Sequence, residues 1–351
     1  MRVHIDGIIF SLQKHGGITT YFRELLKRFK PEHGALMTLE QPVQQTFSST
    51  DLPAVECLER PGRRLERMRV ARPPDAGRCD VFHSTYYRRP ASPSQPSVVT
   101  VHDFVYERFA RGPRKWRHQW SMVGAIRQAQ RIICISEATR QDLLELVPLR
   151  ANQQVSVIHH GVSDIFRPLQ RTQTQAATPR PFILFVGQRS GYKNFGLALA
   201  TLNELPDFEL HCVGGGALTA EELSAASPAT RERVRHLGSV DDEQLNLLYN
   251  QAHCLLYPSL YEGFGMPVLE AMRAGCPVVC VDCKAVVEVG GEALSISDDA
   301  RDPAALAKAV LATLDADTRA KLRALGLRRC QEFSWERCFD QTLDLYRSLQ
   351  P

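Results

Sequence analysis

Short apolar runs alternate with amphipathic segments along most of the chain. The first run covers residues 1–9, and Gly16–Gly17 then opens a segment over residues 19–29 in which apolar positions recur at helical spacing. Strand-like runs that alternate with helical segments are typical of parallel sheets connected by helices. The pattern therefore predicts an α/β chain. Further strands are expected at residues 81–83, 97–102, 131–135, 155–159, 182–186, 209–213, 254–257 and 277–281.

The alternation restarts after residues 167–180, a segment with two prolines, several Gln and Thr and few apolar side chains. This composition is typical of a linker, and 351 residues are more than one core usually holds. We therefore predict two α/β domains, at residues 1–167 and 168–333, followed by a C-terminal helix within residues 334–351. The other expected helices lie at residues 137–146, where Ser136 supplies an N-cap, and at 195–205 and 242–251.

Composition narrows the class of protein. Hydrophobic residues make up 44% of the chain and charged residues 23%, as in globular proteins. No apolar run reaches the roughly 18 residues that a membrane-spanning helix needs, and the N-terminus lacks a secretory core. We expect a cytoplasmic protein whose ten cysteines are reduced thiols. Cys280 and Cys283 lack the second ligand pair of a zinc site, and Asp315 and Asp317 lie in a helical region, so no metal is expected.

Charge is divided unevenly along the chain. Residues 1–170 carry 25 basic and 16 acidic side chains, a net +9, whereas residues 171–351 carry 18 and 23, a net −5. Arginine beside tryptophan on a helix surface suits a peripheral contact with anionic lipid, while the other interpretation is a solvated basic face. The sequence leaves both open. The two basic clusters are Arg60, Arg63, Arg64, Arg67, Arg69 and Arg72, and then Arg108, Arg111, Arg114, Lys115 and Arg117 with Trp116 and Trp120.

Residues 257–281 place two glutamates around a glycine-rich bend that opens a short helix. Pro267 suits the start of a helix, and Gly275 followed by Pro277 ends it after about two turns. Free backbone amides at such an N-terminus attract a diphosphate. The motif predicts a site for a phosphorylated ligand, in which Glu270 accepts hydrogen bonds from paired hydroxyls such as those of a ribose, and Glu262 contacts a different part of the same ligand.

The whole string, Pro-Ser-x-Tyr-Glu-Gly-Phe-Gly-x-Pro-x-Leu-Glu-Ala-Met-x-x-Gly-x-Pro-Val-Val, resembles the E-x7-E signature of the retaining glycosyltransferases of family 4. These enzymes have the GT-B fold, two Rossmann-like domains with a donor cleft between them. The resemblance implies that the first domain binds the acceptor, that the second binds the nucleotide sugar, and that the closing helix crosses back to the first domain. It assigns donor binding to Gly263, Phe264, Gly265, Met266 and Glu270.

The segment Phe-Val-Gly-Gln-Arg-Ser-Gly-Tyr-Lys-Asn-Phe, residues 185–195, resembles the donor-phosphate loop of the same family. Many relatives place an arginine directly after the glycine, where this chain has Gln188 and then Arg189. The resemblance implies that Gly187, Arg189 and Lys193 bind the diphosphate, where cations stabilise the charge that develops on the leaving group. The spacing is not that of a Walker A loop.

Other turns complete the expected donor site. By resemblance, the regions of Gly214, Gly238 and Val240 line the nucleotide pocket, although ordinary βα turns would also explain them. Gly214–Gly216 lacks the dinucleotide fingerprint, which disfavours a Rossmann oxidoreductase. In the first domain, Gly16 and Gly17 resemble the family's glycine loop. Thr100-Val101-His102-Asp103 resembles its strand-end His-Asp, so His102 is expected to face the donor sugar.

The resemblance as a whole implies a metal-independent hexosyltransferase that retains the anomeric configuration by front-face attack, with His102, Glu262, Arg189 and Lys193 as catalytic residues. The loop variant is similar to mannosyltransferases of bacterial surface polysaccharide and lipopolysaccharide assembly. We therefore expect GDP-mannose as donor, a saccharide or lipid-linked acceptor, a cytoplasmic location that extends to the inner membrane face, and no nucleic-acid partner. The alternatives are a UDP-hexose or GDP-deoxysugar transferase, a GT-B sugar-nucleotide epimerase and a non-catalytic sugar-nucleotide-binding protein.

Overall fold

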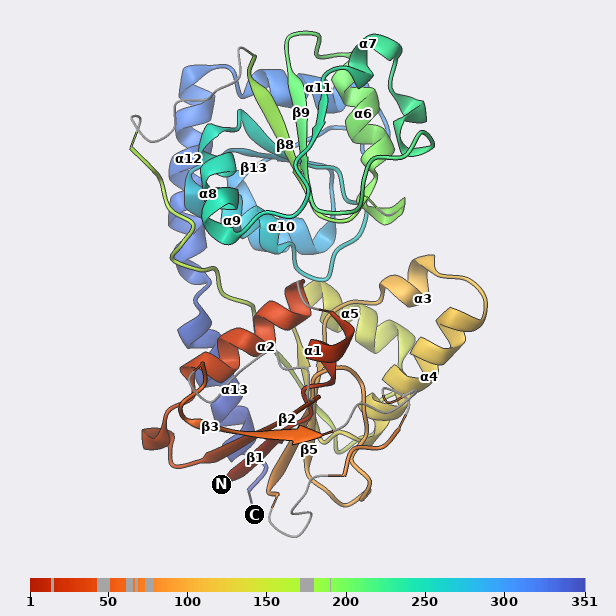
Figure 1. Ribbon diagram of the computed structural model, residues 1–351, viewed down its shortest axis with the longest axis vertical. Coiled ribbons are helices and arrows are strands. Elements are labelled where there is room, and N and C mark those ends of the chain that lie inside the picture. The colour runs from red at the N-terminus through yellow and green to blue at the C-terminus, as the bar shows by residue number, and fades with distance from the viewer. Residues whose placement is uncertain are drawn as a thin grey trace. The chain divides into compact units, whose positions relative to one another are not determined.

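The computed structural model describes residues 1–13, 16–42, 51–60, 66, 69–72, 79–170, 180–189 and 191–350. The chain forms two compact units, both of which can be followed in Figure 1. The first unit consists of Met1–Gly161 with Trp335–Pro351, and the second of Val162–Ser334. The first unit ends at Gly161, which lies a few residues before the linker-like segment 167–180 where the sequence predicts the domain boundary. Residues 171–179 of that segment lie outside the described residues.

The described part of the first unit contains one sheet of seven parallel strands, in the order β3-β2-β1-β4-β5-β6-β7. The strands are β1 (Arg2–Ile5), β2 (Leu36–Pro42), β3 (Val55–Arg60), β4 (Val81–Ser84), β5 (Ser97–Val101), β6 (Arg131–Cys134) and β7 (Gln154–Val157). The helices are α1 (Ile8–Leu12), α2 (Gly17–Arg28), α3 (Val105–Phe109), α4 (Pro113–Gln128), α5 (Glu137–Leu146) and α13 (Trp335–Arg347).

The second unit repeats this architecture, with six parallel strands among its described residues, in the order β10-β9-β8-β11-β12-β13. The strands are β8 (Phe182–Val186), β9 (Glu209–Val213), β10 (Val234–His236), β11 (Cys254–Tyr257), β12 (Val278–Cys280) and β13 (Leu294–Ile296). The helices are α6 (Phe195–Asn203), α7 (Pro228–Arg231), α8 (Asp242–Gln251), α9 (Met266–Ala274), α10 (Lys284–Gly290), α11 (Pro303–Ala312) and α12 (Ala316–Arg329).

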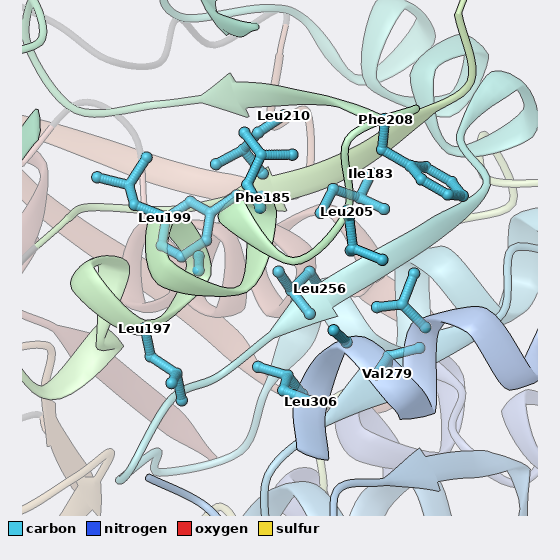
Figure 2. Packing of buried hydrophobic residues seen from close by; sticks show 14 of the residues in the cluster. Ile183, Phe185, Leu197, Leu199, Leu205, Phe208, Leu210, Leu256, Val279 and Leu306 are labelled. Atoms are coloured by element: carbon cyan, nitrogen blue, oxygen red, sulfur yellow. The ribbon is translucent and has the colours of Figure 1, made fainter. Parts of the chain in front are cut away.

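The core of the second unit explains why its strands are continuous apolar runs. Every residue of β8 is buried, because a parallel strand is covered by helices on both faces of the sheet. Figure 2 shows Ile183 and Phe185 of this strand among side chains from neighbouring elements, including Leu199 of α6, Leu256 of β11 and Leu306 of α11. The buried sheet is thus a rigid support for the loops at its edge.

Helix α13 belongs to the first unit, where it packs against α2. The rings of Phe29 and Phe339 lie 6.5 Å apart, and Arg28 Nη2 lies 2.8 Å from Glu336 Oε1. This helix is the closing helix that the sequence places within residues 334–351. Its buried positions include Trp335, Phe339 and Tyr346, which follow one helical face.

Several elements, including strands β2, β3, β10 and β13 and helix α1, are not among those expected from the apolar runs. The first strand ends at Ile5, not at residue 9, and α1 follows after a close turn at Gly7, where an added Cβ would meet Glu40 O at 2.6 Å. Strand β2 contains the buried Glu40 and Gln41, which interrupt its apolar run, and β3 alternates with charged residues. Strand β13 has only three residues, which is too short for a periodicity to show.

Candidate active site

Three glycine turns lie next to each other at the carboxyl edge of the second sheet. Gly187 follows β8, Gly214 follows β9 and Gly238 follows β10. Gly187 N donates to Val213 O at 2.9 Å, and Gly214 N donates to Gly238 O at 2.8 Å. This edge of an open parallel sheet is where ligands bind. The structure therefore brings together three residues that the sequence assigns to nucleotide binding, and Val240 follows them, half-buried, before α8.

Glycine is required at the middle turn. Gly214 has φ +88°, in the left-handed region that residues with a Cβ rarely adopt, and an added Cβ would lie 3.2 Å from Gly187 O. The backbones of the first two turns are thus packed directly against each other. A side chain at this position would separate them.

The predicted phosphate loop and the glutamate motif meet through a lysine. Lys193 ends the 3-10 turn η4 (Gly191–Lys193), and its Nζ lies 2.5 Å from Glu262 Oε1 and 3.3 Å from Tyr257 Oη. The side chains of Lys193 and Glu262 are 13% and 11% exposed. The backbone joins the same two loops, because Leu260 N donates to Tyr192 O at 2.8 Å. Two segments about seventy residues apart therefore form one local site.

The glutamate motif forms the bend and helix that its sequence predicts. Gly265 has φ +98° and caps α9, which contains Pro267 in its first turn and ends at Gly275 with φ +78°. Gly263, Phe264 and Gly265 are buried, and Met266, the first helical residue, is partly exposed. The N-terminus of α9 thus follows Glu262 within the same bend, so a helix dipole and the Lys193–Glu262 pair act on one site.

Glu270 has a partner that the sequence did not indicate. Tyr249 at the end of α8 donates its hydroxyl to Glu270 Oε2 at 2.9 Å. Burial raises the pKa of Glu270 to about 7, although the tyrosine hydrogen bond favours the carboxylate. Near neutral pH this group is therefore divided between its charged and neutral forms. Tyr249 and Tyr257 are buried in the core of the second unit like the apolar residues around them. The sequence pattern therefore did not indicate that their hydroxyls contact site residues.

Arg189 is placed differently from the expectation of an arginine open to the diphosphate. Its side chain is 3% exposed, and its guanidinium donates to the carbonyls of Gly214, Gly216 and Ala217. Its Nε also lies 2.9 Å from Glu222 Oε1. The guanidinium therefore contacts the Gly214 turn and an acidic side chain, whereas Lys193 contacts the glutamate motif.

In the first unit, His102 follows β5 at the carboxyl edge of its sheet, as expected from the sequence. It is 5% exposed, and burial lowers its pKa to about 3, so the ring is neutral at physiological pH. Its ring lies 5.4 Å from that of Tyr21 and 5.8 Å from that of His160. Its Nε2 has no hydrogen-bond partner among the described residues. Asp103 Oδ1 accepts a hydrogen bond from the backbone N of Val105, the first residue of α3, at 2.9 Å.

The glycine pair of the first unit begins α2. Gly16 is the N-cap with φ +149°, and Gly17 is the first helical residue. Tyr21, on the same helix, is fully buried, and its hydroxyl lies 3.3 Å from Thr100 Oγ1. Thr100 also lies 2.9 Å from His83 Nε2. The Gly16–Gly17 loop is thus attached through Tyr21 to the strand that carries His102.

Within the described residues, no three or more His, Cys, Asp or Glu side chains are grouped so as to hold a metal ion. No helix in this part of the chain is both long and apolar enough to cross a bilayer.

Sequence comparison identifies both halves of the chain. Residues 166–326 match the family described as glycosyl transferases group 1, and residues 15–164 match glycosyltransferase family 4. The chain is 30% identical over 272 residues to the O-antigen chain mannosyltransferase B of Escherichia coli, covering 72% of this chain and 70% of that protein. It is 31% identical over 289 residues to the alpha-maltose-1-phosphate synthase of Mycobacterium tuberculosis, covering 72% and 73%.

Solved structures agree on the fold. Sucrose-phosphate synthase from Thermosynechococcus elongatus superposes with a TM-score of 0.78 at 19% identity, covering 99% of both chains. HepE of Anabaena, solved in complex with UDP and glucose, gives a TM-score of 0.75 at 17% identity and the same coverage. The chain therefore belongs to glycosyltransferase family 4 and is a hexosyltransferase with the GT-B fold of two Rossmann-like domains.

Proposed function

We propose that this enzyme transfers mannose from GDP-mannose to a hydroxyl of a saccharide or lipid-linked saccharide during polysaccharide biosynthesis. The observation that carries the proposal is the joining of the Lys193 loop and the Glu262 motif at the N-terminus of α9. A cation and helix amides in one place suit a diphosphate. The similarity to a mannosyltransferase of O-antigen synthesis supports mannose as the sugar. The domain functions remain those expected from the sequence, with the acceptor bound by the first unit.

Lys193, Glu262 and Glu270 have distinct tasks in this proposal. Lys193 and the amides of α9 stabilise the negative charge that gathers on the diphosphate as the glycosidic bond breaks. Glu262 accepts hydrogen bonds from hydroxyls of the sugar, and Lys193 orients its carboxylate at 2.5 Å. Tyr249 holds Glu270 Oε2, so the second oxygen of Glu270 accepts from the ribose hydroxyls. These cationic and amide groups take the place of a divalent ion on the diphosphate.

Retention follows from front-face attack in this proposal. The bond between the anomeric carbon and the phosphate oxygen breaks, and the acceptor oxygen forms its bond on the same face. The departing phosphate oxygen accepts the acceptor's proton, so no protein nucleophile is required. His102, neutral because burial lowers its pKa to about 3, is proposed to hydrogen-bond the donor sugar without adding charge.

The donor is tested with the purified protein and four ligands: GDP, UDP, GDP-mannose and UDP-glucose. Mannose transfer predicts that GDP and GDP-mannose raise the melting temperature more than the uridine compounds, and that GDP-mannose incubated with saccharide acceptors gives an α-linked product by NMR. A β-linked product would overturn retention. Stabilisation by the uridine compounds alone would favour the second candidate, a UDP-hexose transferase, for which the UDP complex of HepE provides support. Conversion of the donor alone to another sugar nucleotide would indicate an epimerase.

We also propose that the first unit contacts an anionic membrane surface through α3 and α4. Trp116 and Trp120 are 71% and 57% exposed and lie four residues apart, on one face of α4, while Phe109 at the end of α3 is 45% exposed. The guanidinium of Arg89 lies 4.9 Å from the Trp120 ring centroid. Exposed tryptophan among arginines is the combination that anchors proteins at a lipid interface. In the other basic cluster, Arg63, Arg64 and Arg67 lie outside the described residues.

Vesicle sedimentation tests this contact. Binding to vesicles of phosphatidylcholine and phosphatidylglycerol should fall with added salt and drop about tenfold or more in a Trp116→Ser/Trp120→Ser double variant, because two interfacial anchors are lost. Leu311→Ser, which alters a side chain 45% exposed on the second unit, is the control and should bind as the unaltered protein does. Two results would contradict the contact: the protein binds neutral and anionic vesicles equally, or the tryptophan variant binds anionic vesicles as well as the control does.

A further inference from the structure

The contacts of Arg189 differ from those expected of a residue that binds a phosphate group. Its Nη1 donates to Gly214 O at 2.9 Å, and its Nη2 donates to Gly216 O at 2.5 Å and to Ala217 O at 3.3 Å. Three carbonyls of one turn are thus bound by one guanidinium. With its side chain 3% exposed, Arg189 is far less accessible than Lys193, whose side chain is 13% exposed.

A carboxylate also binds the guanidinium of Arg189. Arg189 Nε lies 2.9 Å from Glu222 Oε1, and Nη2 lies 3.5 Å from Glu222 Oε2. Glu222 is itself fixed at the start of the 3-10 turn η5 (Glu222–Ala225), because its Oε2 accepts from Thr219 N at 2.9 Å and its N donates to Thr219 Oγ1 at 3.1 Å. Planar guanidinium groups suit such two-oxygen partners. The arginine charge is therefore already compensated within the second unit.

The turn that Arg189 binds needs this support. Gly214 and Gly215 have φ values of +88° and +70°, and an added Cβ on Gly215 would lie 2.6 Å from Arg189 Nη1. The guanidinium thus fills the space that a side chain would take. Gly214 also bonds to Gly238 at the end of β10, and His236 Nε2 lies 3.3 Å from Gly214 O. Arg189 thus contacts the turn that follows β9, which is itself hydrogen-bonded to the turn that follows β10.

We propose that Arg189 is a positioning residue, which holds the Gly214–Ala217 turn for the nucleoside part of the donor and leaves the diphosphate to Lys193 and the N-terminus of α9. This inference rests on the proposed function, since it assigns the parts of a nucleoside diphosphate to parts of that site. It also revises the direct phosphate contact that the sequence resemblance implies for Arg189. The side chain acts on the ligand through the backbone of the turn.

The test compares nucleotides that differ by one phosphate. Dissociation constants are measured calorimetrically for GDP and GMP, or for UDP and UMP where uridine nucleotides bind, with Arg189→Ala, Arg189→Lys, Glu222→Ala and Lys193→Ala. Positioning predicts that Arg189→Ala and Glu222→Ala weaken the diphosphate and the monophosphate by the same factor, about tenfold or more. Lys193→Ala should instead weaken the diphosphate about tenfold more than the monophosphate. The double variant Arg189→Ala/Glu222→Ala should bind as weakly as either single variant.

A direct phosphate contact makes the opposite prediction. Arg189→Ala would then weaken the diphosphate selectively, Arg189→Lys would restore most of that loss, and Glu222→Ala would leave both affinities unchanged. Where affinities are too low to measure, hydrogen exchange of the Gly214–Ala217 amides provides a second test. Exchange should be faster in the Arg189 and Glu222 variants and unchanged in Lys193→Ala. Unchanged exchange in the Arg189 and Glu222 variants would overturn the proposal.

The matched controls are Arg301→Ala and Glu243→Gln, which alter exposed side chains of the same unit and should leave both affinities unchanged. If the unaltered enzyme binds no nucleoside diphosphate at all, the proposed function fails. Selective loss of the diphosphate in Arg189→Ala refutes only the positioning role.

Discussion

Polar side chains at the carboxyl edges of the two sheets differ in their exposure and in how their charges are compensated. In the first unit, His102 follows β5 and is neutral. Arg88, which follows β4, is 3% exposed and lies within 3.9 Å of carboxylate oxygens of Asp6 and Glu40. In the second unit, the lysine–glutamate pair at the ends of β8 and β11 is accessible enough to meet a ligand. Among the residues that the structure describes, Lys193 at the second edge is a cation that can exchange its carboxylate partner for a phosphate.

The contrast agrees with the proposal that the two units have different roles. Buried neutral rings and internally compensated charges make a rigid surface that cannot balance a diphosphate. A partly exposed ion pair next to a helix N-terminus can do so, because the phosphate offers the lysine a second partner as charge develops. The proposed division of the donor and acceptor between the units therefore agrees with the electrostatics of their sheet edges. Four substitutions and one change of pH test this comparison.

The largest effect is expected from removing the accessible cation. Lys193→Ala should lower the transfer rate about 10³-fold, because the charge on the leaving diphosphate loses its main partner, while the protein stays folded. Glu262→Ala should lose transfer to a similar extent. The rate is measured as release of nucleoside diphosphate. Lys308→Ala removes a lysine that is 82% exposed in the same unit and should leave the rate unchanged. A Lys193→Ala enzyme within tenfold of the original rate would refute the role of this residue.

Acid should destabilise the first unit. Burial lowers the pKa of His83 and of His102 to about 3, and that of His160 well below its ordinary 6.5. The unfolded chain binds protons below about pH 6.5 while these folded rings do not, so stability is present above that pH and is lost as the pH falls. Asp6 acts in the opposite direction, because burial raises its pKa to about 6. A net loss of about 3 kcal/mol between pH 7 and pH 5 is expected.

Hydrogen exchange at pH 7 and pH 5, corrected for intrinsic rates, measures this change separately in each unit. Amides of β4 and β5 should lose protection, whereas those of β8 and β11 should change less. In the second unit, His253, whose pKa burial lowers to about 4, and Glu270, whose pKa is raised to about 7, have effects of opposite sign. Equal loss of protection in both sheets would contradict the comparison.

A smaller effect tests how the first unit holds its histidines. Tyr346 on α13 has its hydroxyl 2.6 Å from His83 Nδ1, and both groups are buried. Tyr346→Phe leaves a ring nitrogen without this partner and should lower the free energy of unfolding by about 1.5 kcal/mol, as measured with urea. Tyr106→Phe, at a residue 38% exposed, serves as the control. A loss no greater than that of the control would show that α13 does not support His83.

The smallest effect concerns Glu270 and depends on pH. Because its folded pKa is raised to about 7 from an ordinary 4.5, the stability that its protonated form contributes is present at acidic pH and is lost as the pH rises toward 7. Glu270→Gln should therefore stabilise the protein by about 1 kcal/mol at pH 8 and by little at pH 5. Urea unfolding at the two pH values measures the difference, and Glu243→Gln is the control. A gain that is equal at both values would show that burial of the charge is not the cause.

Elements with strong patterns could be predicted from the sequence with accurate limits. The strands at residues 182–186, 209–213 and 254–257 and the helices at 137–146 and 242–251 have the expected bounds. Ser136 caps its helix as predicted, since its side chain accepts from Thr139 N. In these segments an apolar run or a cap residue alone determines the structure.

The remaining features depend on contacts between distant residues. The helix expected at residues 195–205 ends at Asn203, and β2 forms although it carries Glu40, because neighbouring strands bury it. The two sequence motifs assign Glu262 and Lys193 to the donor site, and the structure places these two side chains together. The hydrogen bond from Tyr249 to Glu270 and the binding of Arg189 to Glu222 join residues 21 and 33 positions apart. Local sequence carries no information about such pairs, so the environment of Arg189 could only be seen in the folded chain.

The most direct test of the account is hydrogen exchange of the full-length enzyme with and without saturating GDP, or UDP if that nucleotide binds more tightly. The account predicts slower exchange at the turns that contain Gly187, Gly214 and Gly265, which are the ends of β8 and β9 and the start of α9. Unchanged exchange at all three turns, in an enzyme that binds the nucleotide, would contradict it.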